Sequence, residues 1–115
     1  MRYALLIYVN ETADAGMTPA QGEAQMAAYN TYTEALSKSG LMRAGDALQP
    51  TTTATSVRTQ GGKTLTMDGP FAETKEQLGG FYIVECDNLD LAIEWAAKIP
   101  HAASGTIEVR PIMEM

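Results

Sequence analysis

The chain has 115 residues, which fits one domain, and its 45% hydrophobic and 19% charged residues are typical of a globular protein rather than a disordered one. Its formal net charge is -6 and its eight Lys and Arg residues are scattered, which argues against nucleic-acid binding. No apolar stretch approaches the ~20 residues that span a membrane. The single cysteine, Cys86, cannot form an internal disulfide, so we expect a cytoplasmic protein in which Cys86 is a small buried side chain.

The first third of the chain predicts a strand, a loop and a helix. Residues 2–9 are almost continuously apolar, which is typical of a strand covered on both faces, and residues 10–17 are expected to form a polar loop. Thr18 followed by Pro19 and Gln21 is a typical helix start, and the helix is expected over 18–39. The spacing predicts that its inner face carries Gly22, Met26, Tyr29, Thr33 and Leu36.

The rest of the chain predicts five strands and a second helix. Strands are expected at 41–48, 55–59, 63–67, 81–86 and 106–113. The Gln60-Gly61-Gly62 turn joins the second and third of these strands into a half-exposed hairpin over 55–67. Asp87 and Asn88 can both cap a helix that Pro100 ends, with Leu89, Ala92, Ile93, Ala96 and Ile99 on its inner face.

Without the hairpin, the order is β-α-β-β-α-β, the ferredoxin-like arrangement of the α+β class, in one domain over 1–115. Two helices cover only one face of such a sheet, yet strands 2–9 and 81–86 look buried on both faces. We therefore expect a homodimer whose two sheets pack face to face.

The most specific segment is the 68–77 connection between the hairpin and the next strand, which begins Asp68-Gly69-Pro70-Phe71. Asp68 lies where a strand ends, and burial beside Phe71 would raise its pKa and suit it to proton transfer. Alternatively, Asp68 accepts backbone N–H bonds and holds the turn. Both interpretations stay open on the sequence alone.

Other polar residues are weaker candidates. Glu73 and Glu76 fall on one side if 72–77 is a short helix, where they would bind a cation or share a proton, or else form a solvated turn with a Lys75 contact. Thr74 is a candidate polar residue of a ligand pocket, with Phe71, Glu73 and Glu76. Tyr8 and Tyr29 are candidates to line a cleft between the sheet and the first helix. The only histidine, His101, reaches Asp68 only if the fold brings them together, and is otherwise an exposed loop residue. Gly79-Gly80 permits a positive φ or a close backbone approach.

No metal-ligand spacing and no cofactor motif is present in the sequence. The whole chain resembles the YCII-related family, in the branch marked by the Asp-Gly-Pro-Phe motif. The resemblance rests on residues 3–8, on the run 68–82 and on the segment Ile107-Glu108-Val109-Arg110-Pro111.

The resemblance implies a dimeric α+β barrel of ferredoxin-like protomers, in a superfamily that also holds muconolactone-isomerase-like enzymes and small monooxygenases. A His-Asp pair in a pocket is suggested to be catalytic in the wider family, but the predicted helix 18–39 of this chain contains no histidine. The branch has no settled reaction. Its members are often encoded near sigma factors.

Two functions therefore stand side by side. The first is a small homodimer that binds a small organic molecule in a pocket beside the 68–77 connection, with acid–base chemistry at Asp68 and no cofactor. The second is an accessory or regulatory protein that docks a transcription component such as a sigma factor through the same connection. An enzyme requires Asp68 to face a cavity, whereas a docking protein requires Phe71, Glu73 and Glu76 to be exposed together.

Overall fold

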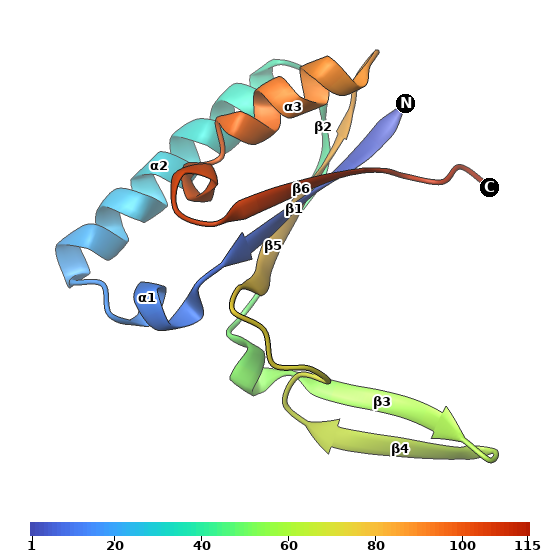
Figure 1. The fold of residues 1–115 in the computed structure, drawn as a ribbon. Helices are drawn as coiled ribbons and strands as arrows, with labels where there is room; N and C mark the ends of the chain where they lie inside the picture. Colours follow the sequence, from blue (N-terminus) through green and yellow to red (C-terminus); the bar gives the residue numbers. More distant parts are fainter.

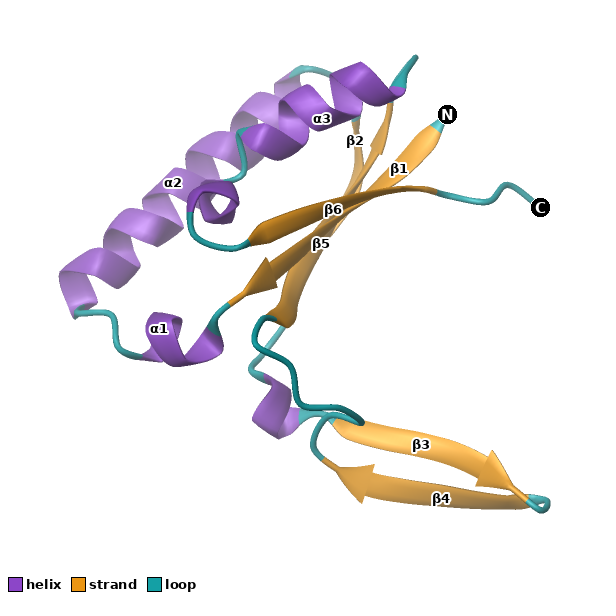
Figure 2. Cartoon of the chain, viewed as in Figure 1, coloured by secondary structure: helices purple, strands orange, loops and turns teal.

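A computed structural model describes residues 1–115 and contains a four-stranded antiparallel sheet with helices on one face and a separate β-hairpin (Figure 1; Figure 2). The sheet strands are β1 (Arg2–Val9), β2 (Met42–Ala47), β5 (Gln77–Glu85) and β6 (Thr106–Pro111). The helices are α1 (Glu11–Ala15), α2 (Pro19–Lys38) and α3 (Leu89–Ala97), with short 3-10 turns η1 (Thr51–Thr53) and η2 (Pro100–Ala103). The hairpin consists of β3 (Thr55–Gln60) and β4 (Lys63–Asp68).

The sheet order is β2-β5-β1-β6, with every neighbouring pair antiparallel. Strands β1 and β2 are therefore parallel and separated by β5, and α2 makes the crossover between them. This order is that of the ferredoxin-like fold, so the predicted α+β class and the β-α-β-β-α-β order are confirmed. No helix combines the length and the apolar character that crossing a bilayer requires.

The core lies between the sheet and the two long helices. Alternate residues of β1 are buried, as the two-residue period of a strand requires, and they pack with buried side chains of β5, α2 and α3. The most deeply buried large side chains are Leu5, Leu36, Val84 and Ile99. Cys86 is buried, as predicted.

The predicted inner faces of both helices are partly wrong. On α2 the inward side chains are Gln25, Tyr29, Tyr32, Thr33 and Leu36, whereas Met26 is 64% exposed. On α3 they are Leu91, Ala92, Trp95 and Ala96, whereas Leu89 and Ile93 are exposed. Both errors are rotations of the inward face: it includes Gln25 and Tyr32 on α2, and Leu91 and Trp95 on α3, which the apolar pattern did not predict.

Three local expectations also change. Residues 11–15 form α1 rather than a loop, because Asn10 caps the helix by accepting from the Ala13 N–H at 3.0 Å. Strand β5 begins at Gln77, four residues early, and the 72–77 helix is absent. Gly79 and Gly80 therefore lie inside β5, where a Cβ on Gly80 would stand 2.9 Å from the Asp46 carbonyl oxygen. The close approach, not a positive φ, requires glycine there.

The hairpin pairs only with itself, from Thr55 opposite Asp68 to Gln60 opposite Lys63. Its two strands are almost entirely exposed, more than the half exposure that the sequence predicts. It projects from the body at the end of the sheet where β5 begins, on the side away from α2 and α3 (Figure 1).

The second face of the sheet carries no covering element. On β1 this open face presents Ala4, Leu6 and Tyr8, because the alternate residues of the strand point to the helices. The strand register places Phe81 of β5 and Glu108 of β6 opposite Leu6, and Ile83 of β5 opposite Ala4. The centre of the open face is therefore apolar.

The close packing of Gly105 leads to a prediction for the stability of the fold. A Cβ on Gly105 would stand 2.2 Å from the Tyr8 carbonyl oxygen, so Gly105→Ala is expected to destabilise the fold by about 1–3 kcal/mol through overpacking against the backbone. The matched control is Gly22→Ala on α2, where a Cβ meets nothing within 4 Å and which is expected to gain about 0.5–1 kcal/mol. Urea unfolding of the three proteins measures both changes, and equal stability of the Gly105 variant and the wild type would contradict the first.

Candidate functional site

His101 is the centre of the most concentrated polar cluster in the protein. It lies in η2, the short turn that follows the buried Ile99, and it is only 7% exposed. The expectation of an exposed loop histidine is therefore wrong. Pro100 begins η2, and the close packing of Gly105 on Tyr8 holds the end of this segment against β1, so that the imidazole faces Gln25 and Tyr29 of α2.

Three side chains from two helices contact the imidazole ring. The Tyr29 hydroxyl lies 2.6 Å from Nδ1. The Asp14 carboxylate oxygens lie 3.1 Å and 3.3 Å from Nε2, and the Gln25 amide lies 3.0 Å from the same nitrogen. Both ring nitrogens are thus hydrogen-bonded, which explains how a polar ring is accommodated at this depth.

The partners decide where the ring hydrogen resides. An ionised carboxylate only accepts hydrogen bonds, so Nε2 carries the hydrogen that Asp14 accepts. In the neutral ring Nδ1 is then an acceptor, and the Tyr29 O–H donates to it. The structure places the amide nitrogen of Gln25 3.0 Å from Nε2, and two donors do not bond to each other, so this tautomer requires the Gln25 amide to be turned by 180° to present its oxygen.

Local sequence rules place each of these groups. Asp14 lies in the five-residue helix α1, whose start is fixed by the Asn10 cap. Gln25 and Tyr29 are four residues apart on α2 and therefore share one face. The start of α2 is fixed in turn by a capping box in which Thr18 and Gln21 exchange hydrogen bonds of 2.9 Å and 3.2 Å.

Burial shifts the proton affinity of Tyr29. Partial removal from water raises the pKa of Tyr29 to about 12, while the contact with His101 acts in the opposite direction and the nearby Asp14 carboxylate acts in the same direction as burial. Tyr29 therefore stays a neutral donor and acceptor at physiological pH. Asp14 is 35% exposed, so the cluster reaches solvent on the side of its carboxylate.

The 68–77 connection lies apart from this cluster. Asp68 ends β4 opposite Thr55 at the root of the hairpin, and both Asp68 and Phe71 are exposed. The ring contacts of His101 do not include Asp68. The burial on which the Asp68 prediction depends is thus not supplied by the protomer, and its role in proton transfer stays a prediction.

Asp68 does not hold the turn by accepting hydrogen bonds either. The Gly69 N–H donates to the Ala54 carbonyl at 2.6 Å, the Ser56 hydroxyl donates to the Gly69 carbonyl at 2.8 Å, and Gly69 has a φ of 92° that favours glycine. The backbone of Gly69 therefore fixes the turn that begins the connection.

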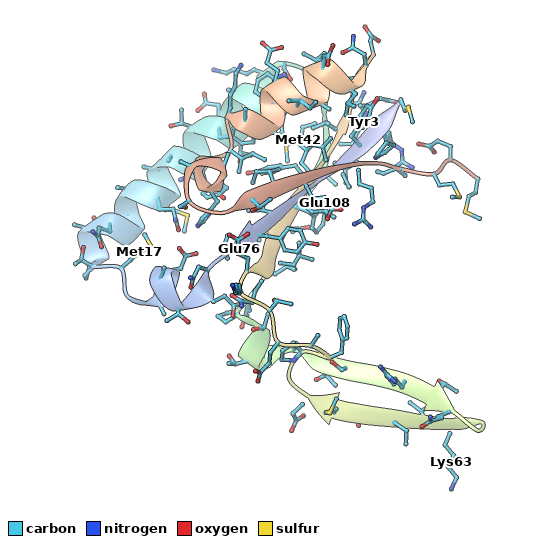
Figure 3. The ribbon with its side chains drawn as sticks, in the orientation of Figure 1. Tyr3, Met17, Met42, Lys63, Glu76 and Glu108 are labelled. Atoms are coloured by element: carbon cyan, nitrogen blue, oxygen red, sulfur yellow. The ribbon has the colours of Figure 1, made fainter.

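The remaining candidates of the connection are spread along it. Glu73 is exposed, the Thr74 hydroxyl donates to the Glu76 carbonyl at 2.5 Å, and Glu76 lies beside the start of β5 while Lys63 marks the far tip of the hairpin (Figure 3). Tyr8 faces the open side of the sheet, so it does not share a cleft with Tyr29. Their predicted contacts with a ligand are not tested by this geometry.

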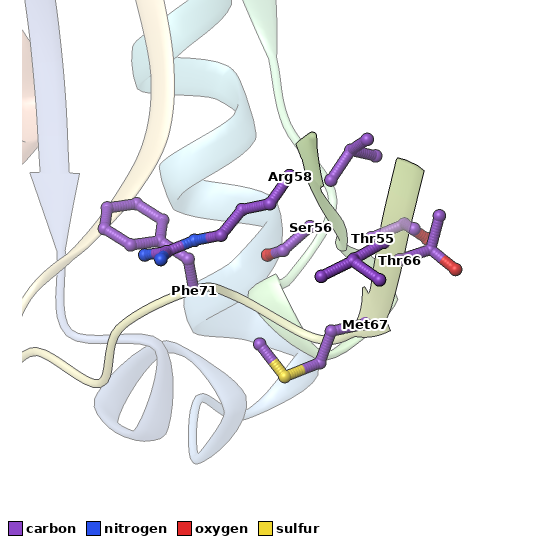
Figure 4. Close-up of a pocket in the computed structure, with 8 residues that line it drawn as sticks. Thr55, Ser56, Arg58, Thr66, Met67 and Phe71 are labelled. Atoms are coloured by element: carbon purple, nitrogen blue, oxygen red, sulfur yellow. The ribbon is translucent and has the colours of Figure 1, made fainter. Parts of the chain in front are cut away.

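A hollow of about 530 Å³ adjoins the connection. Arg58 and Phe71 point toward each other at its edge, and Leu65 and Met67 form much of its apolar wall (Figure 4). No group of three or more His, Cys, Asp or Glu side chains is arranged to hold a metal ion.

The sequence interpretation missed Asp14 and Gln25. A signal for α1 was present, since Asn10 is a favoured cap and is followed by Glu11 and Asp14, acidic residues that stabilise a first helical turn. Nothing local indicates that His101, 87 residues further along the chain, meets Asp14.

The fold and the site define a ferredoxin-like α+β protein with a buried histidine, whose two ring nitrogens contact a tyrosine and an aspartate. The chain matches the YCII-related domain model over residues 1–115, and it belongs to that family. It is similar to an uncharacterised protein of Rhizobium meliloti (strain 1021), with 38% identity over 114 residues that cover 97% of this chain and 92% of the relative.

The raised pKa of Tyr29 predicts that the folded protein loses stability at alkaline pH. Its pKa rises from the ordinary 10.0 to about 12 in the folded state, so above pH 10 the unfolded chain has lost a proton that the folded protein retains. The contribution to folding is complete below pH 10 and is lost as the pH rises toward 12. Urea unfolding across this range is expected to lose stability less steeply for Tyr29→Phe than for the wild type.

Absorbance titration at the phenolate band checks the same shift directly. The folded wild type is expected to keep Tyr29 and Tyr32 protonated above pH 10, because burial raises the pKa of both. Tyr29→Phe should remove one of these late-titrating groups. A late-titrating fraction unchanged by Tyr29→Phe would contradict the shift.

Proposed function

We propose that the protein catalyses proton transfer on a small organic molecule through Tyr29, His101 and Asp14. The observation that carries the proposal is the bonding of His101, whose two ring nitrogens connect a half-buried hydroxyl to a carboxylate. A histidine oriented by a carboxylate on one nitrogen and bonded to a hydroxyl on the other is an acid–base arrangement. No cofactor is needed for the reaction.

The hydrogen-bonded series Tyr29–His101–Asp14 compensates for the low basicity of the neutral Tyr29 hydroxyl. With a pKa of about 12, Tyr29 is a poor base by itself at neutral pH. When a substrate proton reaches the Tyr29 oxygen, the hydroxyl proton of Tyr29 passes to Nδ1 of His101, so no free phenolate accumulates. The ring then carries a positive charge, which the Asp14 carboxylate at 3.1 Å stabilises.

The reverse transfer completes a cycle. Nδ1–H returns its proton to Tyr29, and Tyr29 donates to a different atom of the substrate, so that the net change is an isomerisation with no consumed reagent. The chemistry suits a small carbonyl compound with an acidic C–H beside the carbonyl group. Asp14 and Gln25 border the ring and are candidates to contact the polar end of such a molecule.

The test is proton exchange with solvent. The protein is incubated in D₂O with a panel of small keto acids, lactones and enol-forming acids, and deuterium uptake is followed by mass spectrometry. Tyr29→Phe and Asp14→Asn are each expected to reduce uptake by about 10²-fold or more, since acid–base groups contribute on that scale.

Asp68→Asn is the comparison variant for the second predicted site. It is expected to retain wild-type exchange if the His101 cluster carries the reaction. Loss of exchange in Asp68→Asn, with full exchange in Asp14→Asn, would reverse the assignment in favour of Asp68. Melting curves of all the variants separate a lost catalyst from a lost fold.

We also propose that the chain belongs to the branch of its family with the Asp-Gly-Pro-Phe motif, which it carries at 68–71, and that it acts in the cytoplasm, which its single Cys86 fits. Its proposed assembly is a homodimer in which the open faces of two sheets pack together as a barrel. The apolar centre around Leu6, Phe81 and Ile83 supports this assembly, because a solvent-facing sheet ordinarily alternates with polar residues.

Leu6 gives the test of the dimer. Leu6→Glu would place a charge beside Glu108, its cross-strand neighbour, in the middle of the interface, and is expected to convert the dimer to a monomer at micromolar concentration. Ile93→Glu, at a 48% exposed position on α3, is the control and should leave the dimer intact. Sedimentation velocity measures both, and a monomeric wild type would overturn the proposed dimer.

The alternative function, docking of a transcription component such as a sigma factor, is favoured by one observation. Phe71 is 79% exposed and Glu73 is exposed close to it in sequence, as a docking patch requires, although Glu76 is partly buried. This alternative predicts that Phe71→Ser abolishes binding to a purified sigma factor while leaving solvent exchange at the His101 cluster unchanged.

A further inference from the structure

The β3–β4 hairpin is a folded element without a folding partner. A two-stranded hairpin is marginally stable in water by itself, and this one makes its strand pairs only with itself. The chain has a radius of gyration of 16.0 Å, whereas a compact domain of this length has about 13 Å. The difference reflects the distance at which the hairpin stands from the body.

On one face of the hairpin, β4 and the outgoing turn present apolar side chains beside Ser56 and Arg58 of β3. The register places Met67 opposite Ser56 and Leu65 opposite Arg58, so Met67 and Leu65 project from the same face. They are 58% and 46% exposed, and Phe71 beside them is 79% exposed. These side chains line the hollow of about 530 Å³ described above, which gives the face a shape as well as an apolar character.

The hairpin and the open sheet face lie on the same side of the molecule. The hairpin leaves the body on the side away from α2 and α3, which is the side that the open face presents (Figure 1; Figure 2). A second molecule that packs on the open face therefore lies beside the hairpin, with no rearrangement of the chain.

The charges favour a second copy of this chain as the molecule that packs there. The hairpin carries Arg58 and Lys63 against one acid, Asp68, whereas the whole chain has a formal net charge of -6. The hairpin has a net charge of +1 and the rest of the chain has -7, so the hairpin of one copy is attracted to the body of another, and every copy supplies both. In a two-fold dimer the contact is made twice.

We propose that the β3–β4 hairpin is an arm that reaches past the sheet-to-sheet contact and packs Leu65, Met67 and Phe71 against the body of a second copy. The inference rests on the proposed homodimer and goes beyond it, because two sheets can pack face to face without any contribution from the arm. Packing on the partner buries the Asp68-Gly69-Pro70-Phe71 turn, which is exposed in the single chain.

The root of the arm is built to hold a fixed direction. The Glu11 carboxylate accepts from the Thr51 N–H at 2.8 Å and from the Thr51 hydroxyl at 2.7 Å, just before β3. The Gln77 side chain accepts from the Glu11 N–H at 3.0 Å and donates to the Thr74 carbonyl at 2.6 Å, at the end of the 68–77 connection. Both stems of the arm are thus tied to α1, which suits an element that must meet a partner in one orientation.

The first experiment is photo-cross-linking of the purified full chain with p-benzoylphenylalanine in place of Phe71. The matched control carries the same group in place of Met26, which is 64% exposed on the helical side of the molecule. A covalent dimer from the Phe71 probe and none from the Met26 probe is the expected result. A wild-type dimer in which the Phe71 probe reacts only within its own chain, or gives no adduct, overturns the arm contact.

The second experiment measures the strength of the dimer by sedimentation. Leu65→Ser combined with Met67→Ser is expected to weaken the dimer about tenfold or more, because both side chains lose an apolar contact, whereas Met26→Ser should leave it unchanged. Melting of the body should be unaffected, since the arm makes few contacts with it. A dimer of unchanged strength overturns the arm and leaves the sheet-to-sheet dimer standing, whereas a monomeric wild type overturns both.

Discussion

Helix α1 connects the His101 cluster to the root of the β3–β4 hairpin. Within five residues it directs the Asp14 carboxylate to His101 and the Glu11 carboxylate to Thr51 at the root of the hairpin. Its position is fixed by the Asn10 cap and by the Glu11 N–H, which donates to the Gln77 side chain. A shift of this short helix would move the partner of the buried imidazole and the root of the arm together. The His101 cluster and the root of the hairpin are therefore linked through one short helix.

The large elements of the fold are predictable because each has its own local signal. The continuous apolar run of β1, the capping box at Thr18 and the Gly61-Gly62 turn each specify one element without reference to the rest of the chain. The inward faces of α2 and α3 are harder to predict, because apolar residues such as Met26 and Ile93 occur on both sides of helices that pack on one surface only. The early start of β5 at Gln77 depends on pairing with Val9, which no local pattern contains.

The candidate site shows the limit of local inference more clearly. His101 lies in a short turn rich in small residues, a context that is typical of an exposed histidine. Its burial follows from the path of the chain after α3, where Gly105 passes within contact distance of the Tyr8 backbone and brings the loop back against the sheet. The sequence interpretation gave weight to Asp68 because it stands in the most specific motif, but specificity of sequence indicates a constraint without saying whether that constraint is catalytic or structural.

The Asp-Gly-Pro-Phe turn illustrates this distinction. The positive φ of Gly69, its N–H bond to Ala54 and the fixed φ of Pro70 hold the backbone in one conformation, in which Phe71 is left 79% exposed. A rigid turn that displays an aromatic side chain to water gains nothing for the isolated protomer, because exposed apolar area does not stabilise a fold. The same turn becomes favourable when a second surface covers Phe71, since the ring then contributes its burial energy at little cost in backbone entropy. The geometry of the motif therefore suits the proposed contact with a second copy, whereas the proposed acid–base chemistry rests on the buried His101.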